Sequence, residues 1–208
     1  MAEEGIIIDL DEFIRSKYPL PPSSHPVNQV MGAFVLSAMK DYAANFYRKK
    51  NLNLDEYKLL LSLKKQYPRE VEGEYDRAIH RARLIYNEFR RQYSTGVIHG
   101  IPPCRRNIKI SNGIFLEGKP TLIARNTKEI YVIKSFSLHF PLEQEMPDIF
   151  YETLGLSLIF PPPYRMWLCG FSGTGQLQAK IIESSLQDRE KFVKELYLYV
   201  KKRKGDKK

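Results

Sequence analysis

Cysteine and metal-ligand motifs are nearly absent from the sequence. Its two cysteines, Cys104 and Cys169, are too few for a disulfide framework and do not form a zinc motif. The four histidines are scattered, without the regular spacing that metal ligands show. We therefore expect neither disulfide bonds nor a zinc site.

Long apolar segments are also missing. No stretch approaches the roughly 18 consecutive apolar residues of a membrane-spanning helix. The N-terminus, MAEEGIIIDLDEF, begins acidic, and its apolar run is too short for a signal peptide. These absences predict a cytoplasmic protein without a membrane partner. Glutamine is scarce beside abundant isoleucine, lysine, glutamate, arginine and tyrosine, a composition compatible with a thermophilic source.

Positive charge is abundant but unevenly distributed. The formal net charge is +9, of which the last eight residues, KKRKGDKK, supply +5 through six bases and one acid. Residues 1–200 therefore carry only +4. A basic tail is typical of proteins that bind a polyanion, most commonly nucleic acid, although it also occurs as a solubilising chain end. Charge alone leaves both interpretations open.

The N-terminal half is predicted to be helical. Apolar residues recur at helical spacing, and prolines interrupt the pattern after Tyr18 and at Pro68. Helices are expected over residues 9–18, 27–47, 54–67 and 70–93.

The C-terminal half is predicted to alternate strands and helices. Short apolar runs separated by Ser-Asn-Gly, Gly-Lys-Pro and Asn-Thr-Lys favour an antiparallel meander. Strands are expected over residues 107–110, 113–118, 121–125, 129–136, 164–171 and 176–183, and helices over 147–160 and 189–204. A helix that leaves a sheet and returns to it requires a right-handed crossover and a mixed sheet.

The order of elements predicts an α/β protein with a mixed central β-sheet flanked by helices and a helical N-terminal region. With 208 residues, 43% of them hydrophobic, the chain can bury one sizeable core. We expect a single structural domain in which residues 1–104 are the helical region packed on the core. Residues 105–200 form the α/β core, and residues 201–208 form the basic tail.

Basic residues mixed with aromatic ones predict a nucleic-acid interface. Guanidinium and ammonium groups contact the phosphate backbone, and aromatic rings stack on bases. An ordinary solvated sheet face is the alternative, which stays open. The candidate contacts are Arg105, Arg106, Lys109, Lys119, Arg125, Lys134, Tyr164 and Arg165, with Lys201 and Lys202 in the tail.

The phrase GIFLEGKPTLIARNTKEIYVIKS, together with the order of elements, resembles the PD-(D/E)XK nuclease superfamily. Its RecB-type exonucleases associated with CRISPR loci carry a segment of the form G-(K/R)-P-D-L-I-A…Y-V-I-E-x-K. The resemblance implies a restriction-endonuclease-like core. In that family the aspartate and glutamate hold Mg²⁺ or Mn²⁺, and the lysine assists the attack on the phosphate.

The sequence departs from this pattern at the functional positions. Thr121 stands in place of the aspartate, Lys134 (or Ile133, with a one-residue shift) in place of the glutamate, and Phe136 or Ser135 in place of the lysine. Leu36 replaces the histidine ligand of an upstream helix, Tyr151 lies in the segment matching a downstream helix, and Tyr18 takes the place of an iron–sulfur cysteine. We therefore expect a degenerate member that holds no metal or other cofactor, does not cleave, and binds nucleic acid, most simply single-stranded DNA or DNA ends.

Two other functions stay open. One is an active, metal-dependent DNA exonuclease or endonuclease whose acidic ligands have moved to Glu117, Glu129 or Glu152, with Lys134 as the active-site lysine and Mg²⁺ or Mn²⁺ as the cofactor. The other is a non-enzymatic subunit that docks on a nuclease, integrase or helicase. Its protein partner would then belong to DNA repair, replication or CRISPR machinery.

Overall fold

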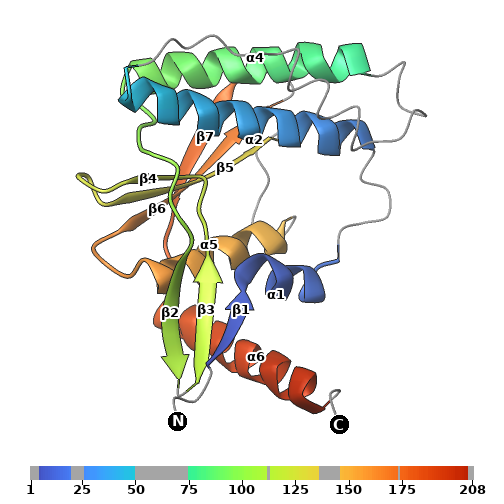
Figure 1. Ribbon diagram of the computed structural model, residues 1–208, viewed down its shortest axis with the longest axis vertical. Coiled ribbons are helices and arrows are strands. Elements are labelled where there is room, and N and C mark those ends of the chain that lie inside the picture. Colours follow the sequence, from blue (N-terminus) through green and yellow to red (C-terminus); the bar gives the residue numbers. More distant parts are fainter. Residues whose placement is uncertain are drawn as a thin grey trace.

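Figure 1 shows the computed structural model of the protein, which describes residues 5–19, 26–49, 75–111, 113–135, 146–172 and 174–205. The helix expected over residues 54–67 lies outside these ranges, and so does Phe136. Within these ranges, no helix combines the length and the apolar character that crossing a membrane requires. The fold is mixed α/β, which confirms the fold class predicted from the sequence.

The elements follow the predicted order, with one added strand at the start. The helices described are α1 (Leu10–Lys17), α2 (Pro26–Tyr47), α4 (Tyr75–Ser94), α5 (Pro147–Ile159) and α6 (Leu186–Gly205). The strands are β1 (Ile6–Asp9), β2 (Arg106–Ser111), β3 (Ile114–Gly118), β4 (Leu122–Ala124), β5 (Glu129–Ser135), β6 (Arg165–Phe171) and β7 (Leu177–Ile182). Because α6 continues to Gly205, residues 201–205 of the predicted tail are helical.

Strand β1 has no counterpart among the predicted elements, because its three isoleucines form a run too short to show a period. It pairs in parallel with β3, placing Ile8 opposite Leu116. The Asp9 side chain accepts hydrogen bonds from the amides of Asp11 (2.9 Å) and Glu12 (3.2 Å) and so caps α1. One residue thus ends the strand and caps the helix.

The strands form two mixed sheets. In the first, β3 lies between its parallel neighbour β1 and its antiparallel neighbour β2. In the second the order is β4-β5-β6-β7, in which β5 and β6 are parallel and the outer pairs are antiparallel. Residues 119–121 join the two sheets, and Pro120 there has no amide hydrogen to continue a ladder. Helix α5 makes the predicted crossover between β5 and β6.

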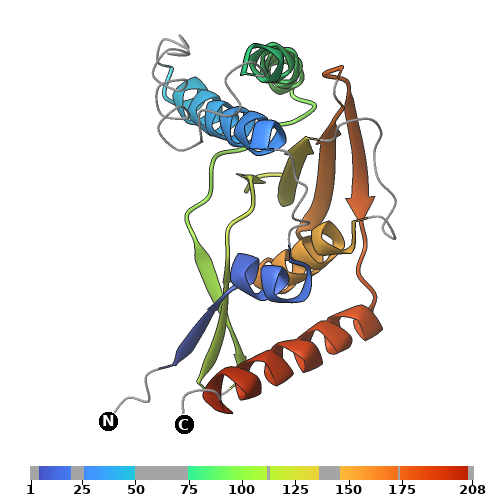
Figure 2. The same cartoon turned by 90° about the vertical axis from the view of Figure 1, so that its right-hand side faces the viewer.

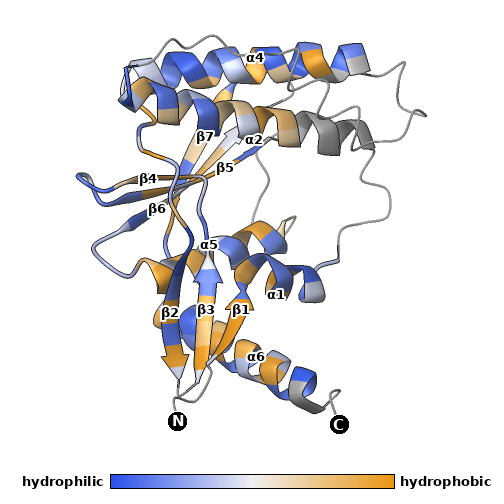
Figure 3. Cartoon of the chain, viewed as in Figure 1, coloured by the Kyte–Doolittle hydropathy of each residue, from blue (hydrophilic) through white to orange (hydrophobic). Residues whose placement is uncertain are grey.

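Helices cover both faces of the four-stranded sheet. Figures 1 and 2 show α2 and α4 side by side on one face, with α5 on the other and α6 beyond it. Along β5, Tyr131 and Ile133 join the core under α2 and α4, whereas Ile130 and Val132 join the core formed with α1, α5 and α6. Figure 3 shows hydrophobic residues along most of β1, and hydrophobic residues alternating with hydrophilic ones along α4. The strand β5 is therefore anchored through both of its faces.

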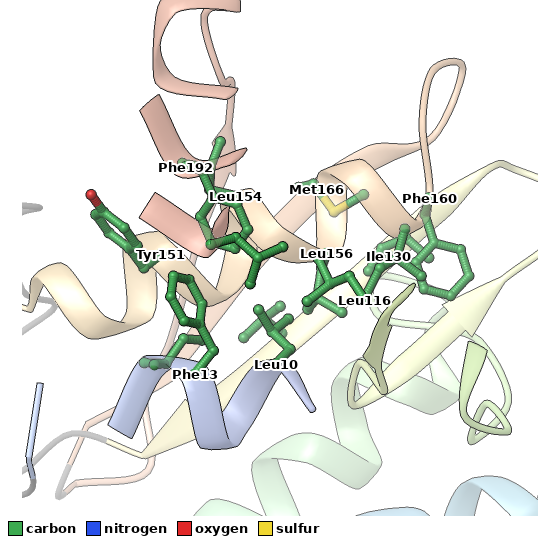
Figure 4. Close-up of a cluster of buried hydrophobic side chains, with 14 of the residues drawn as sticks. Leu10, Phe13, Leu116, Ile130, Tyr151, Leu154, Leu156, Phe160, Met166 and Phe192 are labelled. Atoms are coloured by element: carbon green, nitrogen blue, oxygen red, sulfur yellow. The ribbon is translucent and has the colours of Figure 1, made fainter. Parts of the chain in front are cut away.

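The core on the α5 side is built by helices and strands from both halves of the chain (Figure 4). Phe13 of α1 meets Phe192 of α6 edge to face, with ring centroids 5.3 Å apart. Gly155 of α5 lies directly against Leu10 and Phe192, so a larger residue there would overlap them. This close approach fixes α1, α5 and α6 relative to one another, and other residues of α1 and α5 line the cavity described next.

Candidate functional site

A cavity of about 320 Å³ lies where α1, α2, α5, β5 and the connection 119–121 meet. Its lining contains four basic and three acidic side chains. The residues that line it are Asp11, Ile14, Arg15, Tyr18, Leu36, Lys40, Lys119, Pro120, Thr121, Ile133, Lys134, Asp148 and Glu152.

Several positions singled out by the family resemblance meet in this cavity, although they lie far apart in the sequence. Leu36 comes from α2 and Thr121 from the connection that precedes β4. Ile133 and Lys134 come from β5, and Tyr18 follows α1. The fold thus brings these five residues to one place.

Tyr151 does not line the cavity. Its hydroxyl donates a hydrogen bond to the Glu195 carboxylate of α6 over 2.7 Å, and Lys17 of α1 forms an ion pair with the same carboxylate. The Lys17 ammonium also lies 4.5 Å from the centre of the Tyr151 ring. Burial, and then the neighbouring Glu195 charge, raise the pKa of Tyr151. Tyr151 therefore ties α5 to α1 and α6.

The Thr121 side chain is engaged with the backbone of the neighbouring strand. Its hydroxyl oxygen accepts a hydrogen bond from the Ile133 amide over 3.1 Å, and its own amide donates to the Tyr131 carbonyl over 3.0 Å. These bonds extend the pairing of β4 with β5 by one residue. At the position of the family's aspartate, the side chain joins two strands.

Lys134 and Glu152 form an ion pair inside the cavity. The Lys134 ammonium lies 2.5 Å from Glu152 Oε2, and the two side chains are only 31% and 19% exposed. Burial alone would lower the pKa of Lys134, but the Glu152 carboxylate outweighs that effect and raises it. Because side chains alternate along β5, Lys134 points toward α5, whereas Ile133 is buried against the α2 and α4 core. A permanent positive charge thus occupies this part of the cavity.

Two further lysines lie close to Lys134. Burial and the positive charge of Lys119 lower the pKa of Lys40, Lys134 adds to this effect, and Asp11 partly opposes it. Within the described parts of the chain, neither Lys40 nor Lys119 has an ion-pair partner. The lysines 40, 119 and 134 are called the lysine cluster below.

The three acids considered as relocated ligands lie in three separate places. Glu117 of β3 is bonded to Arg105, Glu129 begins β5, and Glu152 is bonded to Lys134 near the other end of β5. Positions 129 and 134 of one strand are roughly 16 Å apart at about 3.3 Å per residue. Among the residues that the structure describes, no group of three or more His, Cys, Asp or Glu side chains could hold a metal ion.

Glu129 belongs to a buried hydrogen-bond network. Its carboxylate accepts from the Thr127 hydroxyl (2.7 Å), the Tyr131 hydroxyl (2.9 Å) and the Trp167 indole (3.3 Å). Arg165 also donates to it over 3.1 Å. Burial alone would raise the pKa of Glu129, but the hydrogen bonds from Thr127, Tyr131 and Trp167 outweigh it and hold the pKa below its usual value. Glu129 is only 7% exposed, so this satisfied network fixes the start of β5.

Arg105, a predicted nucleic-acid contact, bridges two acids of neighbouring strands. Its guanidinium is bonded to Asp9 of β1 and, over 2.8 Å, to Glu117 of β3, which is the register partner of Asp9. These two carboxylates raise the pKa of Arg105. The exposed Arg105 side chain therefore joins β1 to β3.

The other predicted contacts are spread over the surface. Only Lys119 and Lys134 of that set line the cavity. The Arg106 guanidinium lies 5.1 Å from the centre of the Phe160 ring, and the Tyr164 ring faces Lys128 at 5.5 Å. The remaining basic positions are all exposed. Arg165 forms an ion pair with Glu129, and the others are Lys109, Arg125, Lys201 and Lys202.

Four charged cavity residues were not among the predicted contacts: Asp11, Arg15, Lys40 and Asp148. The sequence offered a reason to consider Lys40, because it follows Leu36 by four residues and so lies on the same face of the helix. Arg15 and Asp11 show the same spacing on α1. Spacing alone, however, gives no indication of which helix faces meet.

The described elements form a mixed α/β fold with a charged cavity beside β5. No protein-family model matches the sequence, and no curated protein does either. Among solved structures, the chain is similar to a candidate exonuclease from Eubacterium rectale, with a TM-score of 0.54 at 10% identity, over 91% of this chain and 70% of that one. A second match, to the structure of SSO0001, spans 90% of this chain and 82% of the SSO0001 chain at 13% identity. Its TM-score of 0.37 is too low to indicate a shared fold.

Proposed function

We propose that this protein binds nucleic acid, in particular single-stranded DNA or DNA ends, on a nuclease-like fold that does not cleave it. The observation that carries the proposal is the ion pair between Lys134 and Glu152 in the cavity. An ammonium group beside a phosphate neutralises its charge directly, which is also one of the roles of a catalytic cation. Binding can therefore persist without metal chemistry.

The residues around the cavity do not fit Mg²⁺ or Mn²⁺. Such hard cations take several oxygen ligands, with carboxylates supplying most of the charge. Here the Thr121 hydroxyl is bonded to β5, and the Glu152 carboxylate is bonded to Lys134. Asp11 and Asp148 also line the cavity, but a cation there would face the positive charges of the lysine cluster. We therefore assign no catalytic step through a metal.

The lysine cluster supports an anionic ligand. The mutual repulsion of Lys40 and Lys119 is relieved when a negatively charged group is placed between them. The exposed lysines at the end of α6 add positive charge that a longer strand would reach.

The proposal is tested by DNA binding measured across a range of salt concentrations. For a single strand, each phosphate contact contributes about 0.7 to the slope of log affinity against log salt. Lys40→Met and Lys119→Met should each weaken binding and reduce the slope by about that amount. Lys191→Met, on the exposed surface of α6, is the matched control. Absence of binding at physiological salt would contradict the proposal.

Cleavage is assayed separately with Mg²⁺ and with Mn²⁺. We expect no product above that of a heat-denatured sample. Robust metal-dependent cutting that is lost in Glu117→Ala, Glu129→Ala or Glu152→Ala would instead establish an active nuclease with relocated ligands.

A further inference from the structure

The lysine cluster differs from an ordinary basic surface because all three lysines line one cavity, with Lys40 and Lys134 partly buried and Lys119 exposed. Its side chains come from α2, the connection 119–121 and β5, and they converge on one cavity. Burial is the largest contribution to the lowered pKa of Lys40, so its ammonium has lost part of its hydration. A ligand that enters must restore the interactions that water no longer supplies.

We propose that the cavity receives the phosphorylated end of a nucleic-acid strand, with the terminal phosphate held by Lys40 and Lys119. This inference rests on the proposed nucleic-acid binding and specifies the part of the strand that is recognised. Lys134 completes the phosphate site while remaining bonded to Glu152.

Charge favours a terminal phosphate over an internal one. Glu152 compensates Lys134, which leaves the ammonium groups of Lys40 and Lys119 without an ion-pair partner in the described parts of the chain. A phosphate monoester carries about −1.5 to −2 charge at neutral pH and can pair with both. An internal phosphodiester carries one negative charge and can compensate only one of them.

The remaining acids add to this selectivity. Asp11 and Asp148 line the same cavity, so its seven charged side chains sum to only +1. A cavity with so small a net charge attracts a polyanion weakly through its long-range field. Tight binding then requires direct contacts to the lysines, which favours the group with the highest charge density.

The size and the apolar lining suit the last nucleotide of a strand. A volume of about 320 Å³ lies at the lower end of ligand cavities, roughly 300 to 1,000 Å³. Leu36, which is partly exposed, offers apolar contact to a sugar or base, and Tyr18 offers an aromatic ring. Five chain segments surround this space, which favours an end that enters over a strand that passes through.

The test compares single-stranded DNA of one sequence in four forms: 5′-phosphorylated, 3′-phosphorylated, unphosphorylated at both ends, and circular. Fluorescence anisotropy gives the dissociation constants of the linear forms, and that of the circular form is obtained by its competition with a labelled linear strand. We expect one phosphorylated form to bind about tenfold more tightly than the unphosphorylated form, the equivalent of one charge-assisted contact. Whichever phosphorylated form binds more tightly identifies the recognised strand end as 5′ or 3′. Inorganic phosphate should displace that form selectively.

Variants locate the preference. Lys40→Met and Lys119→Met should each bring the phosphorylated form to within about twofold of the unphosphorylated one, while Lys191→Met keeps the full difference. Equal binding of circular and all linear forms would overturn the end recognition and leave nucleic-acid binding intact. Failure to bind any form would overturn both. A preference that survives in both folded cavity variants, verified by circular dichroism, would overturn the assignment to this cavity.

Discussion

The ammonium of Lys134 on β5 lies 2.5 Å from the carboxylate of Glu152 on α5, and this ion pair joins the four-stranded sheet to its crossover helix. Both side chains are largely withdrawn from solvent. Removing one partner leaves the other with an unpaired charge in a partly buried place. The pair is therefore structural as well as part of the candidate site.

Replacing Lys134 by Met should destabilise the protein by about 1–3 kcal/mol, because Glu152 then keeps its desolvation without its partner. Glu152→Gln should cost less, since the amide can still accept a hydrogen bond from Lys134. Urea unfolding of both single variants and the double variant gives the coupling energy. We expect the double variant to be more stable than the sum of the two losses predicts. Strict additivity would mean that the ion pair contributes nothing to stability.

Glu129→Ala should be among the more damaging substitutions at an acidic residue, at about 2–4 kcal/mol. It leaves donors from Tyr131, Trp167 and Arg165 without their shared acceptor at the start of β5. Thermal unfolding measures the loss, and Glu183→Ala, at an exposed position, is the control. An unchanged melting temperature would contradict the network described above.

Stability at acid pH should depend on the contact between Asp9 and Arg105. Burial alone would raise the pKa of Asp9, but hydrogen bonds from Arg105 and from the Glu12 and Asp11 amides outweigh this and hold it below its usual value. A carboxyl whose pKa is lowered by folding stabilises the protein above its unfolded pKa of about 3.9, and this stabilisation is lost as the pH falls through the folded value.

Arg105→Met should therefore raise the pKa of Asp9 toward its ordinary value and flatten the loss of stability below about pH 4. Unfolding free energies between pH 5 and pH 2.5, with an NMR titration of the Asp9 carboxyl, measure both effects. Arg106→Met, the adjacent arginine packed near Phe160, should leave the titration unchanged. An identical acid profile in the wild type and Arg105→Met would show that the bridge does not form in solution.

A metal site should be created by introducing two acids into the cavity. The double variant Thr121→Asp, Lys134→Glu places one carboxylate just before β4 and one on β5, beside Glu152, and removes one positive charge from the cavity. We expect calorimetry to detect saturable Mn²⁺ binding by this variant and none by the wild type. Lys109→Glu, on the exposed surface of β2, is a charge control outside the cavity. Equal Mn²⁺ affinity of the wild type and the double variant would contradict the exclusion of a divalent ion.

The order of helices and strands could be predicted because periodicity is a local property. Strand β6, for example, is one apolar run between a proline run and a glycine-containing turn. Strand β1 was missed because its identity depends on β3, more than 100 residues further along the chain. The division into two sheets depends in the same way on how β3 and β4 pair with distant strands.

The site could be predicted only in part. The phrase around Thr121 and Lys134 indicated the position of the cavity, because both residues lie in one short segment. Lys40 and Arg15 come from helices whose docking is set by tertiary packing, including the contact of Gly155 with Leu10. The partner of Lys134 could not be inferred either, since Glu117, Glu129 and Glu152 are equivalent in sequence and differ only in what surrounds them.

The burial of β5 on both faces has a practical consequence for protein engineering. Ile130, Tyr131 and Val132 hold the strand through two separate cores, so the strand does not depend on the cavity side chains contributed by α2 and the connection 119–121. Positions such as Leu36, Lys40 and Lys119 can therefore be randomised together in a library while the scaffold stays folded. Selection from such a library could retarget the chain to other small anions.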